Sequence, residues 1–251
     1  MLMTLLMDVV NEITTTIRIT DRFKKMLVIG HRGCGKSTIL NMVAEDLQEE
    51  YHVVAFSAAD VINMMDVEVV DILLGTYLQV LESVKEQKWF TDMLLKPFNS
   101  MMSFLKQEIN IESFNLAGIS LKFKVEEDSR GKIRKGLRNE IDVLQNNISN
   151  ACINIQKKMD KDILIIIDDL DKLETDFAER IFYNNPELLI LPQAKIIYTF
   201  PLDTYYCSDF IKIRGRYEDQ FISLVDIKDF TGQNLENSQQ ALINWSFAKI
   251  S

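Results

Sequence analysis

One short stretch, residues 26–40, constrains the fold of this chain more than any other. Its sequence, MLVIGHRGCGKSTIL, is an apolar run, a glycine-rich turn that ends in Lys-Ser-Thr, and the start of an amphipathic helix. Residues 30–37 fit the pattern G-x-x-x-x-G-K-[ST], in which consecutive backbone N–H groups face one anion and the following helix presents its positive end to it. The order strand, loop and helix predicts a phosphate-binding loop, called the phosphate loop below.

The polar positions of the phosphate loop each have a chemical reason. Lys36 is expected to reach the β- and γ-phosphates of a nucleotide, and the Ser37 hydroxyl is expected to ligate Mg²⁺. The residues predicted to bind the phosphates are Gly30, Gly33, Cys34, Gly35, Lys36, Ser37 and Thr38. Because Cys34 lies inside the loop, we expect alkylation of its thiol to block nucleotide binding and bound ATP to protect it. The alternative is an ordinary glycine turn between a strand and a helix.

A second chemical feature lies far downstream, at residues 163–169 with the sequence ILIIIDD. Five apolar residues predict a strand buried on both faces, and the acidic pair follows at the carboxyl edge, where open parallel sheets bind ligands. Asp168 is expected to hold Mg²⁺, mostly through its water shell, and Asp169 to orient and polarise the attacking water. Taken alone, the segment also fits a buried strand that runs into an acidic turn.

Composition limits the classes of protein that fit. The chain has 251 residues, and 47% of them are apolar, which suits one large α/β domain with an inserted module. A net charge of −9 argues against a nucleic-acid-binding surface over the whole chain. Three cysteines without paired or metal-ligand spacing predict free thiols in a reducing cytoplasm. No apolar run approaches the length of a membrane span, and no signal peptide is indicated.

The hydrophobic pattern predicts a single domain over residues 1–251, with its core at 20–60 and 160–227. The N-terminal segment predicts a short helix followed by the strand-prone sequence TTTIRIT. Further strands are expected at 51–57, 196–199 and 221–227.

Residues 61–160 are predicted to form a mostly helical insertion between the second strand and the acidic strand. Within it, alternation over 109–125 predicts a hairpin, and a polar break is expected at 126–135 before a second long helix. A basic cluster near this break either contacts phosphates or an acidic partner, or forms a solvated loop and helix start. The basic cluster consists of Arg130, Lys132, Arg134, Lys135 and Arg138.

Taken together, the phosphate loop and the acidic strand resemble those of P-loop ATPases of the AAA+/STAND group. The likeness extends to IIDDLDKL at residues 166–173, which is similar to the hhhhDDLD signature of STAND and KAP-type ATPases. The resemblance implies a P-loop NTPase fold with a parallel sheet of order 5-1-4-3-2 flanked by helices. It also implies ATP and Mg²⁺ as ligands, hydrolysis that switches or drives assembly, and Thr199 at the sensor 1 position, acting with Lys36 and Asp169.

The chain also departs from the AAA+ pattern. Its acidic pair is Asp-Asp rather than Asp-Glu, which favours the STAND side and slow turnover. The helical lid after the fifth strand is expected to be truncated or absent, and no sensor 2 arginine can be placed. Arg180, Arg214 and Arg216 compete as an arginine finger.

The predicted function is that of an ATP-binding, Mg²⁺-dependent ATPase module acting as a molecular switch in bacterial defence or signalling. It is expected in the cytoplasm, without a membrane, and with a protein partner or self-assembly. Two alternatives stay open. One is a nucleotide-dependent DNA-binding or loading factor of the origin-recognition type, which the basic cluster would support. The other is a non-hydrolysing nucleotide-binding scaffold, suggested by the missing lid.

Overall fold

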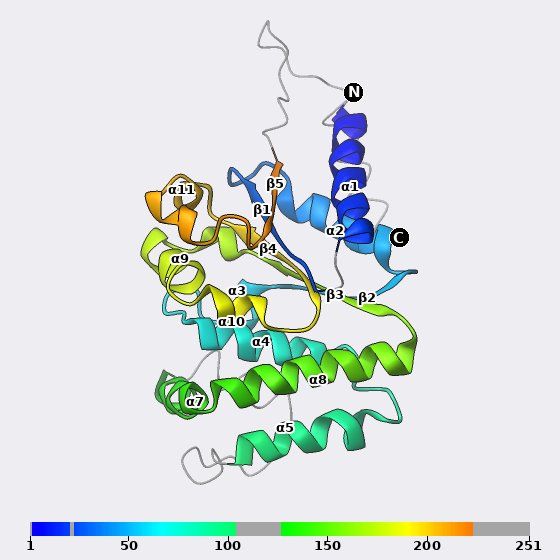
Figure 1. Ribbon diagram of the computed structural model, residues 1–251, viewed down its shortest axis with the longest axis vertical. Coiled ribbons are helices and arrows are strands. Elements are labelled where there is room, and N and C mark those ends of the chain that lie inside the picture. The colour runs from blue at the N-terminus through cyan, green and yellow to red at the C-terminus, as the bar shows by residue number, and fades with distance from the viewer. Residues whose placement is uncertain (1, 21–22, 104–126, 223–251) are drawn as a thin grey trace, which may run out of the picture.

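A five-stranded parallel sheet forms the centre of the protein (Figure 1). The computed structural model describes residues 2–20, 23–103 and 127–222. In chain order, the strands are β1 (Lys25–Gly30), β2 (Tyr51–Ser57), β3 (Asp162–Asp168), β4 (Lys195–Phe200) and β5 (Glu218–Ile222). They lie side by side in the order β2-β3-β4-β1-β5, which is the predicted order 5-1-4-3-2. The expected α/β fold is therefore confirmed.

The central strands are apolar over nearly their whole length because helices cover both faces of the sheet. Every residue of β1 and of β4 is buried, and β3 is partly exposed only at its two ends. Since all five strands run parallel, their carboxyl ends lie at one edge of the sheet. The phosphate loop follows β1. Residues 168–172, called the acidic segment below, lie where β3 ends, so the fold brings both features to this edge.

Helices fill the connections that parallel strands require. The α-helices are α1 (Leu2–Ile19), α2 (Lys36–Leu47), α3 (Ala58–Val61), α4 (Val69–Glu82), α5 (Lys96–Met101), α7 (Glu127–Asn139), α8 (Ile141–Met159), α9 (Thr175–Phe182), α10 (Pro186–Ile190) and α11 (Leu202–Tyr205). Short π- or 3₁₀-turns are η1 (Thr91–Leu95), η3 (Leu170–Lys172) and η4 (Ser208–Lys212). Helices α1 and α2 pack on one face of the sheet, and the core on the other face includes α4, α8 and α9.

The N-terminal segment differs from the expectation of a short helix and a strand-prone stretch. It is one helix, α1, that runs to Ile19. Leu6, Val10, Ile13 and Ile17 are buried at intervals of three or four residues, so they form one stripe of the helix, and α1 packs against α2. This packing outweighs the strand preference of the threonine run.

The insertion between β2 and β3 is helical in its described parts, as predicted. In Figure 1, α4 lies beneath the sheet, α8 lies beneath α4, and α5 lies farther out. The expected polar break at 126–135 is wrong, because α7 begins at Glu127. The last strand, β5, begins earlier than the expected 221–227. The expected hairpin at 109–125 and the C-terminal segment lie outside the described residues.

A cluster of ion pairs attaches α7 to the first turn of α4 and to the segment that leads into it. Arg134 Nε donates to Asp71 Oδ1 at 2.9 Å, and Arg134 Nη1 donates to Asp66 Oδ2 at 2.9 Å. Arg138 Nε donates to Glu68 Oε2 at 2.9 Å. Asp71 is only 1% exposed, so its charge depends on Arg134 for compensation. The basic cluster thus contributes to the packing of the insertion.

We predict that Arg134→Met will lower the free energy of unfolding by about 3–5 kcal/mol, because it leaves the buried Asp71 carboxylate without its partner. Urea denaturation followed by circular dichroism measures this change. Arg138→Met on the same helix is the matched control, since the Arg138 side chain is 56% exposed. Its expected cost is below about 1 kcal/mol. Equal losses in the two variants would contradict the assignment.

Candidate nucleotide-binding site

The backbone of the phosphate loop explains two of its glycines. Gly35, which precedes the first residue of α2, has φ of 93°, a left-handed conformation that favours glycine. Gly30 ends β1, and a Cβ there would lie 2.6 Å from the backbone oxygen of Ile222 in β5. The loop can therefore curl at Gly35, and β5 can pair closely with β1 at Gly30.

Lys36 lies with its ammonium group inside the phosphate loop. Its Nζ donates to the backbone oxygens of Gly30 at 2.8 Å and of His31 at 2.7 Å. The same Nζ lies 2.9 Å from Asp171 Oδ2. Both side chains are almost fully buried. An ion pair therefore joins the loop after β1 to the segment after β3.

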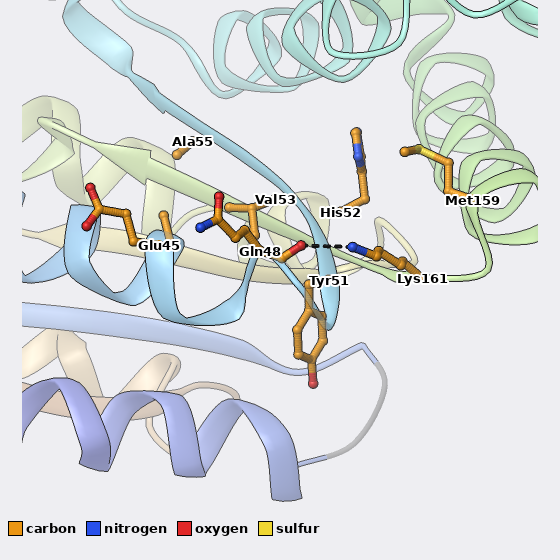
Figure 2. A pocket seen from close by; sticks show the side chains of 9 residues that line it. Glu45, Gln48, Tyr51, His52, Val53, Ala55, Met159 and Lys161 are labelled. Carbon is orange, nitrogen blue, oxygen red and sulfur yellow. Dashed lines mark hydrogen bonds between the residues drawn. The ribbon is translucent and has the colours of Figure 1, made fainter.

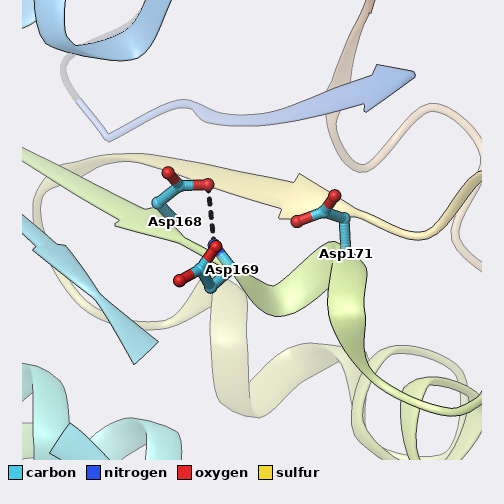
Figure 3. Close-up of side chains that lie close together, drawn as sticks. All are labelled: Asp168, Asp169 and Asp171. Carbon is cyan, nitrogen blue, oxygen red and sulfur yellow. Dashed lines mark hydrogen bonds between the residues drawn. The ribbon is translucent and has the colours of Figure 1, made fainter. Parts of the chain in front are cut away.

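Three carboxylates gather where β3 ends. Asp168 is the last residue of β3, Asp169 has a left-handed φ of 69°, and Asp171 lies in η3 (Figure 3). Oxygen atoms from the three side chains lie within 4.8 Å of one another. Asp168 Oδ1 accepts a hydrogen bond from the backbone N–H of Asp169 at 2.7 Å. The chain thus turns at Asp169, between the end of β3 and η3.

The Asp169 carboxylate is held from two sides. Ser57, the last residue of β2, donates its hydroxyl to Asp169 Oδ2 at 2.7 Å. The Lys172 ammonium lies 2.5 Å from Asp169 Oδ1. Partial burial raises the pKa of Asp169, but the hydrogen bonds from Lys172 and Ser57 outweigh it and leave the pKa below its ordinary value. Asp169 is therefore ionised at neutral pH.

A cavity of about 410 Å³ opens between the phosphate loop and the acidic segment. Its lining contains six residues that the sequence predicted for the site: Gly33, Gly35, Lys36, Ser37, Thr38 and Asp169. Three further lining residues were not predicted: Arg32, Asp171 and Lys172. Four predicted residues are not part of the lining: Gly30, Cys34, Asp168 and Thr199. The cavity thus joins the two motifs that the sequence places far apart.

Two of these four predicted residues lie beneath the cavity. Cys34 is 5% exposed and packs in the core on the α1 and α2 face, with Sγ at 3.9 Å from Lys36 Nζ. The thiol can therefore react with an alkylating reagent only slowly in this conformation. Thr199 is fully buried, and its hydroxyl accepts a hydrogen bond from the Asp171 N–H at 3.4 Å. It contacts the acidic segment rather than the cavity.

Sequence reasoning missed Ser57 and Asp171, although each had a signal. Ser57 is a hydroxyl residue at the end of a predicted strand, and the β2–β3 register pairs it with Asp168. Asp171 is the last acidic residue of the DDLD sequence. The three arginines considered as fingers are absent from the cavity lining among the residues that the structure describes. Arg180 stacks on Phe177, and Arg216 pairs with Glu187.

The donor set suits a nucleotide with a hard divalent cation. The start of α2 and the glycines of the loop offer backbone N–H groups to an anion. The Ser37 hydroxyl and the carboxylates of Asp168, Asp169 and Asp171 offer the oxygen ligands that Mg²⁺ prefers.

A second cavity, of about 490 Å³, lies beside the edge strand β2 (Figure 2). It is lined by residues of α2 and β2 together with Met159 and Lys161, and Lys161 Nζ donates to the backbone oxygen of Gln48 at 3.0 Å. Its titratable side chains include Glu45, His52 and Lys161. This cavity is the larger of the two, but it contains none of the residues predicted for the site.

A comparison with known protein families identifies the family of the chain. Residues 8–200 match the KAP family P-loop domain. The chain belongs to this family. The matched range of this KAP P-loop domain includes the phosphate loop, the acidic segment and Thr199. The match supports nucleotide binding in the cavity between the phosphate loop and the acidic segment. No curated protein matches the chain. Among the described residues of the KAP domain, no helix is long and apolar enough to cross a membrane.

We predict that Gly35→Ala will weaken nucleotide binding roughly 5- to 30-fold, the equivalent of about 1–2 kcal/mol of left-handed strain. A change of backbone conformation that relieves this strain turns the loop N–H groups away from the phosphates. Titration of a fluorescent nucleotide measures the affinity, and thermal melting checks the fold.

Gly131→Ala is the matched control for Gly35→Ala. Gly131 lies in α7, and outside its chain neighbours and the backbone of its own helix no described atom lies within 4 Å of the Cβ it would gain. Its nucleotide affinity should equal that of the wild type. Unchanged affinity of a well-folded Gly35→Ala protein would contradict the role of the loop.

Proposed function

We propose that this KAP P-loop domain binds ATP with Mg²⁺, hydrolyses it slowly, and works as a molecular switch between its nucleotide states. One observation carries the proposal. Lys36, Ser37, Thr38 and Asp169, which supply an ammonium group, two hydroxyls and a carboxylate, line a single cavity at the carboxyl edge of a parallel sheet. Phosphoryl transfer needs these groups together, since it depends on positioning and on neutralising charge.

In this proposal the phosphate loop binds the nucleotide. The N–H groups of the phosphate loop and of the first turn of α2, from Gly33 to Thr38, would surround the β- and γ-phosphates, and the Lys36 ammonium would neutralise part of their charge. Ser37 and Asp168 would hold Mg²⁺. Bound there, the cation would neutralise phosphate charge that develops during transfer.

Asp169 would orient the attacking water. Its carboxylate is ionised, and an ionised carboxylate accepts a hydrogen bond from water. Both of its oxygens already have a partner, Ser57 on one side and Lys172 on the other. These contacts lower its pKa and make it a weaker base, which is consistent with slow turnover. Thr199 would act through the Asp171 backbone, which it contacts.

We also propose a biological setting for this switch. A role in bacterial defence or signalling, in the cytoplasm and through a protein partner or self-assembly, is supported by the likeness of the DDLD segment to STAND and KAP-type ATPases.

Ion pairs within the chain weaken the DNA-loading alternative, because they involve arginines of the basic cluster that was its main support. Arg130, Arg134 and Arg138 form ion pairs with the acidic residues Asp66, Glu68 and Asp71 within the chain. Arginines that are neutralised in this way are poor partners for DNA phosphates. The non-hydrolysing scaffold remains the second candidate, because Asp169 is held on both sides and is a weak base.

Nucleotide binding and phosphate release with Mg²⁺ test the proposal. We predict that the wild type binds ATP and releases phosphate slowly. Lys36→Ala should lose measurable binding, because the phosphates lose their buried positive partner. Asp169→Asn should keep binding but stop turnover. Calorimetry measures the first property, and a coupled phosphate assay measures the second.

Asp209→Asn is the matched control for Asp169→Asn. Asp209 also pairs with a lysine three residues later, Lys212, but 47% of its side chain is exposed and it lies outside the cavity lining. Its turnover should equal that of the wild type. Retained binding by Lys36→Ala would contradict the proposed site, and binding without turnover by the wild type would favour the scaffold.

A further inference from the structure

The Lys36 ammonium has three protons, and three oxygen atoms already surround it. They are the backbone oxygens of Gly30 and His31 and the Oδ2 atom of Asp171, at 2.7–2.9 Å from Nζ. The group that is expected to meet a nucleotide phosphate therefore has no proton to spare in this conformation. A phosphate oxygen can bind Lys36 only if one of the three oxygens leaves.

Of the three oxygens, that of Asp171 is the one suited to exchange. The two carbonyls are neutral and belong to the phosphate loop itself, so they stay near Lys36 as long as the loop keeps its shape. Asp171 carries the negative charge that a phosphate oxygen also carries, and it lies on a separate element, η3. A phosphate that replaces it keeps the buried ammonium compensated, as buried charges require.

From this geometry we infer that Asp171 is a positioning residue. Its carboxylate binds the Lys36 ammonium in the nucleotide-free protein and competes with the incoming phosphate for that ammonium. The inference rests on the proposed nucleotide site and adds a residue and an exchange step to it. No covalent bond changes in this step, because one anion replaces another next to the ammonium group.

The exchange would also act on the rest of the acidic segment. Besides the Asp171 contact with Lys36, the phosphate loop contacts η3 through Arg32 Nη2, which donates to the backbone oxygen of Lys172 at 3.0 Å. Lys172 in turn pairs with Asp169. Release of Asp171 removes the buried contact between η3 and the phosphate loop and leaves the exposed contact with Arg32. The position of η3 and of Lys172, the partner of Asp169, relative to the phosphate loop would then be less restrained. Nucleotide binding is thereby linked to the position of the residue proposed to orient water.

Asp171→Asn tests the inference, since it removes the charge and keeps nearly the same shape. The first readout needs no nucleotide. The rate at which an amine-reactive acetylating reagent labels Lys36 is measured by mass spectrometry, with the exposed Lys96 of the same molecule as the internal reference. Lys36 labelling should be several-fold faster in Asp171→Asn than in the wild type. The Lys36 side chain loses the ionic contact that holds it inside the loop, so the reagent can reach its amino group more often.

The second readout is the affinity for ATP in EDTA, where no divalent cation contributes. Asp171→Asn should bind ATP about tenfold tighter, since a competing hydrogen bond to a charged group is worth roughly 1.5 kcal/mol or more. Asp168→Asn is the matched control. It removes a neighbouring negative charge that does not contact Lys36, so it should change affinity less and leave Lys36 labelling unchanged.

Several results would overturn the inference. Unchanged Lys36 labelling in a folded Asp171→Asn protein would show that Asp171 does not restrain the ammonium. Weaker ATP binding by that variant would show that Asp171 supports the site instead of competing for it. If Asp168→Asn changed Lys36 labelling and ATP affinity as much as Asp171→Asn does, the loss of any nearby negative charge would explain both results, and the contact between Asp171 and Lys36 would not be needed. If no protein binds ATP, the proposed function and the exchange both fail, and labelling still decides whether Asp171 holds Lys36.

Discussion

All five strands run parallel, and the rest of the molecule depends on this constraint. Strands buried on both faces need helices on both sides, and each crossover returns the chain to the same end of the sheet. The phosphate loop after β1 and the acidic segment after β3 therefore meet at one edge, although β4 separates the two strands. The ion pair between Lys36 and Asp171 spans this gap. It is a buried ion pair between the two motifs that the proposed chemistry needs together.

The insertion between β2 and β3 adds layers of helix on the side of the sheet away from α1 and α2. Its attachment depends on charges as well as on apolar contacts, because Arg134 reaches from α7 to the buried Asp71 at the start of α4. The chain segment that carries these acidic residues follows β2 and α3, and β2 ends at Ser57 beside Asp169. The insertion and the candidate site thus share one connection. A movement of η3 and Asp169 would change the hydrogen bond between Ser57 and Asp169, and Ser57 is the residue at which this connection begins.

The sequence predicted the features that depend on local pattern. The apolar runs located the strands, the glycine pattern located the phosphate loop, and the family likeness supplied the strand order. Features that depend on tertiary structure were missed or misjudged. The pairing of Lys36 with Asp171 follows a left-handed turn at Asp169. Aspartate adopts this conformation more readily than most residues, but the sequence pattern did not indicate at which aspartate the turn lies. The burial of Cys34 depends on which side of the loop faces α1 and α2. In α1 and α7, packing against neighbouring helices stabilises segments whose composition suggested a strand and a polar break.

Hydrogen exchange of the backbone amides, followed by mass spectrometry with and without Mg²⁺ and ATP, tests the central claim most directly. A larger cavity beside β2 competes with the cavity between the phosphate loop and the acidic segment, and this measurement distinguishes the two in a single experiment. If the nucleotide lies between the phosphate loop and the acidic segment, peptides that cover residues 30–40 and 166–173 will gain protection. Peptides that cover residues 44–55 and 159–161, beside the second cavity, will not. Protection at the second cavity alone, or at neither, would contradict the account.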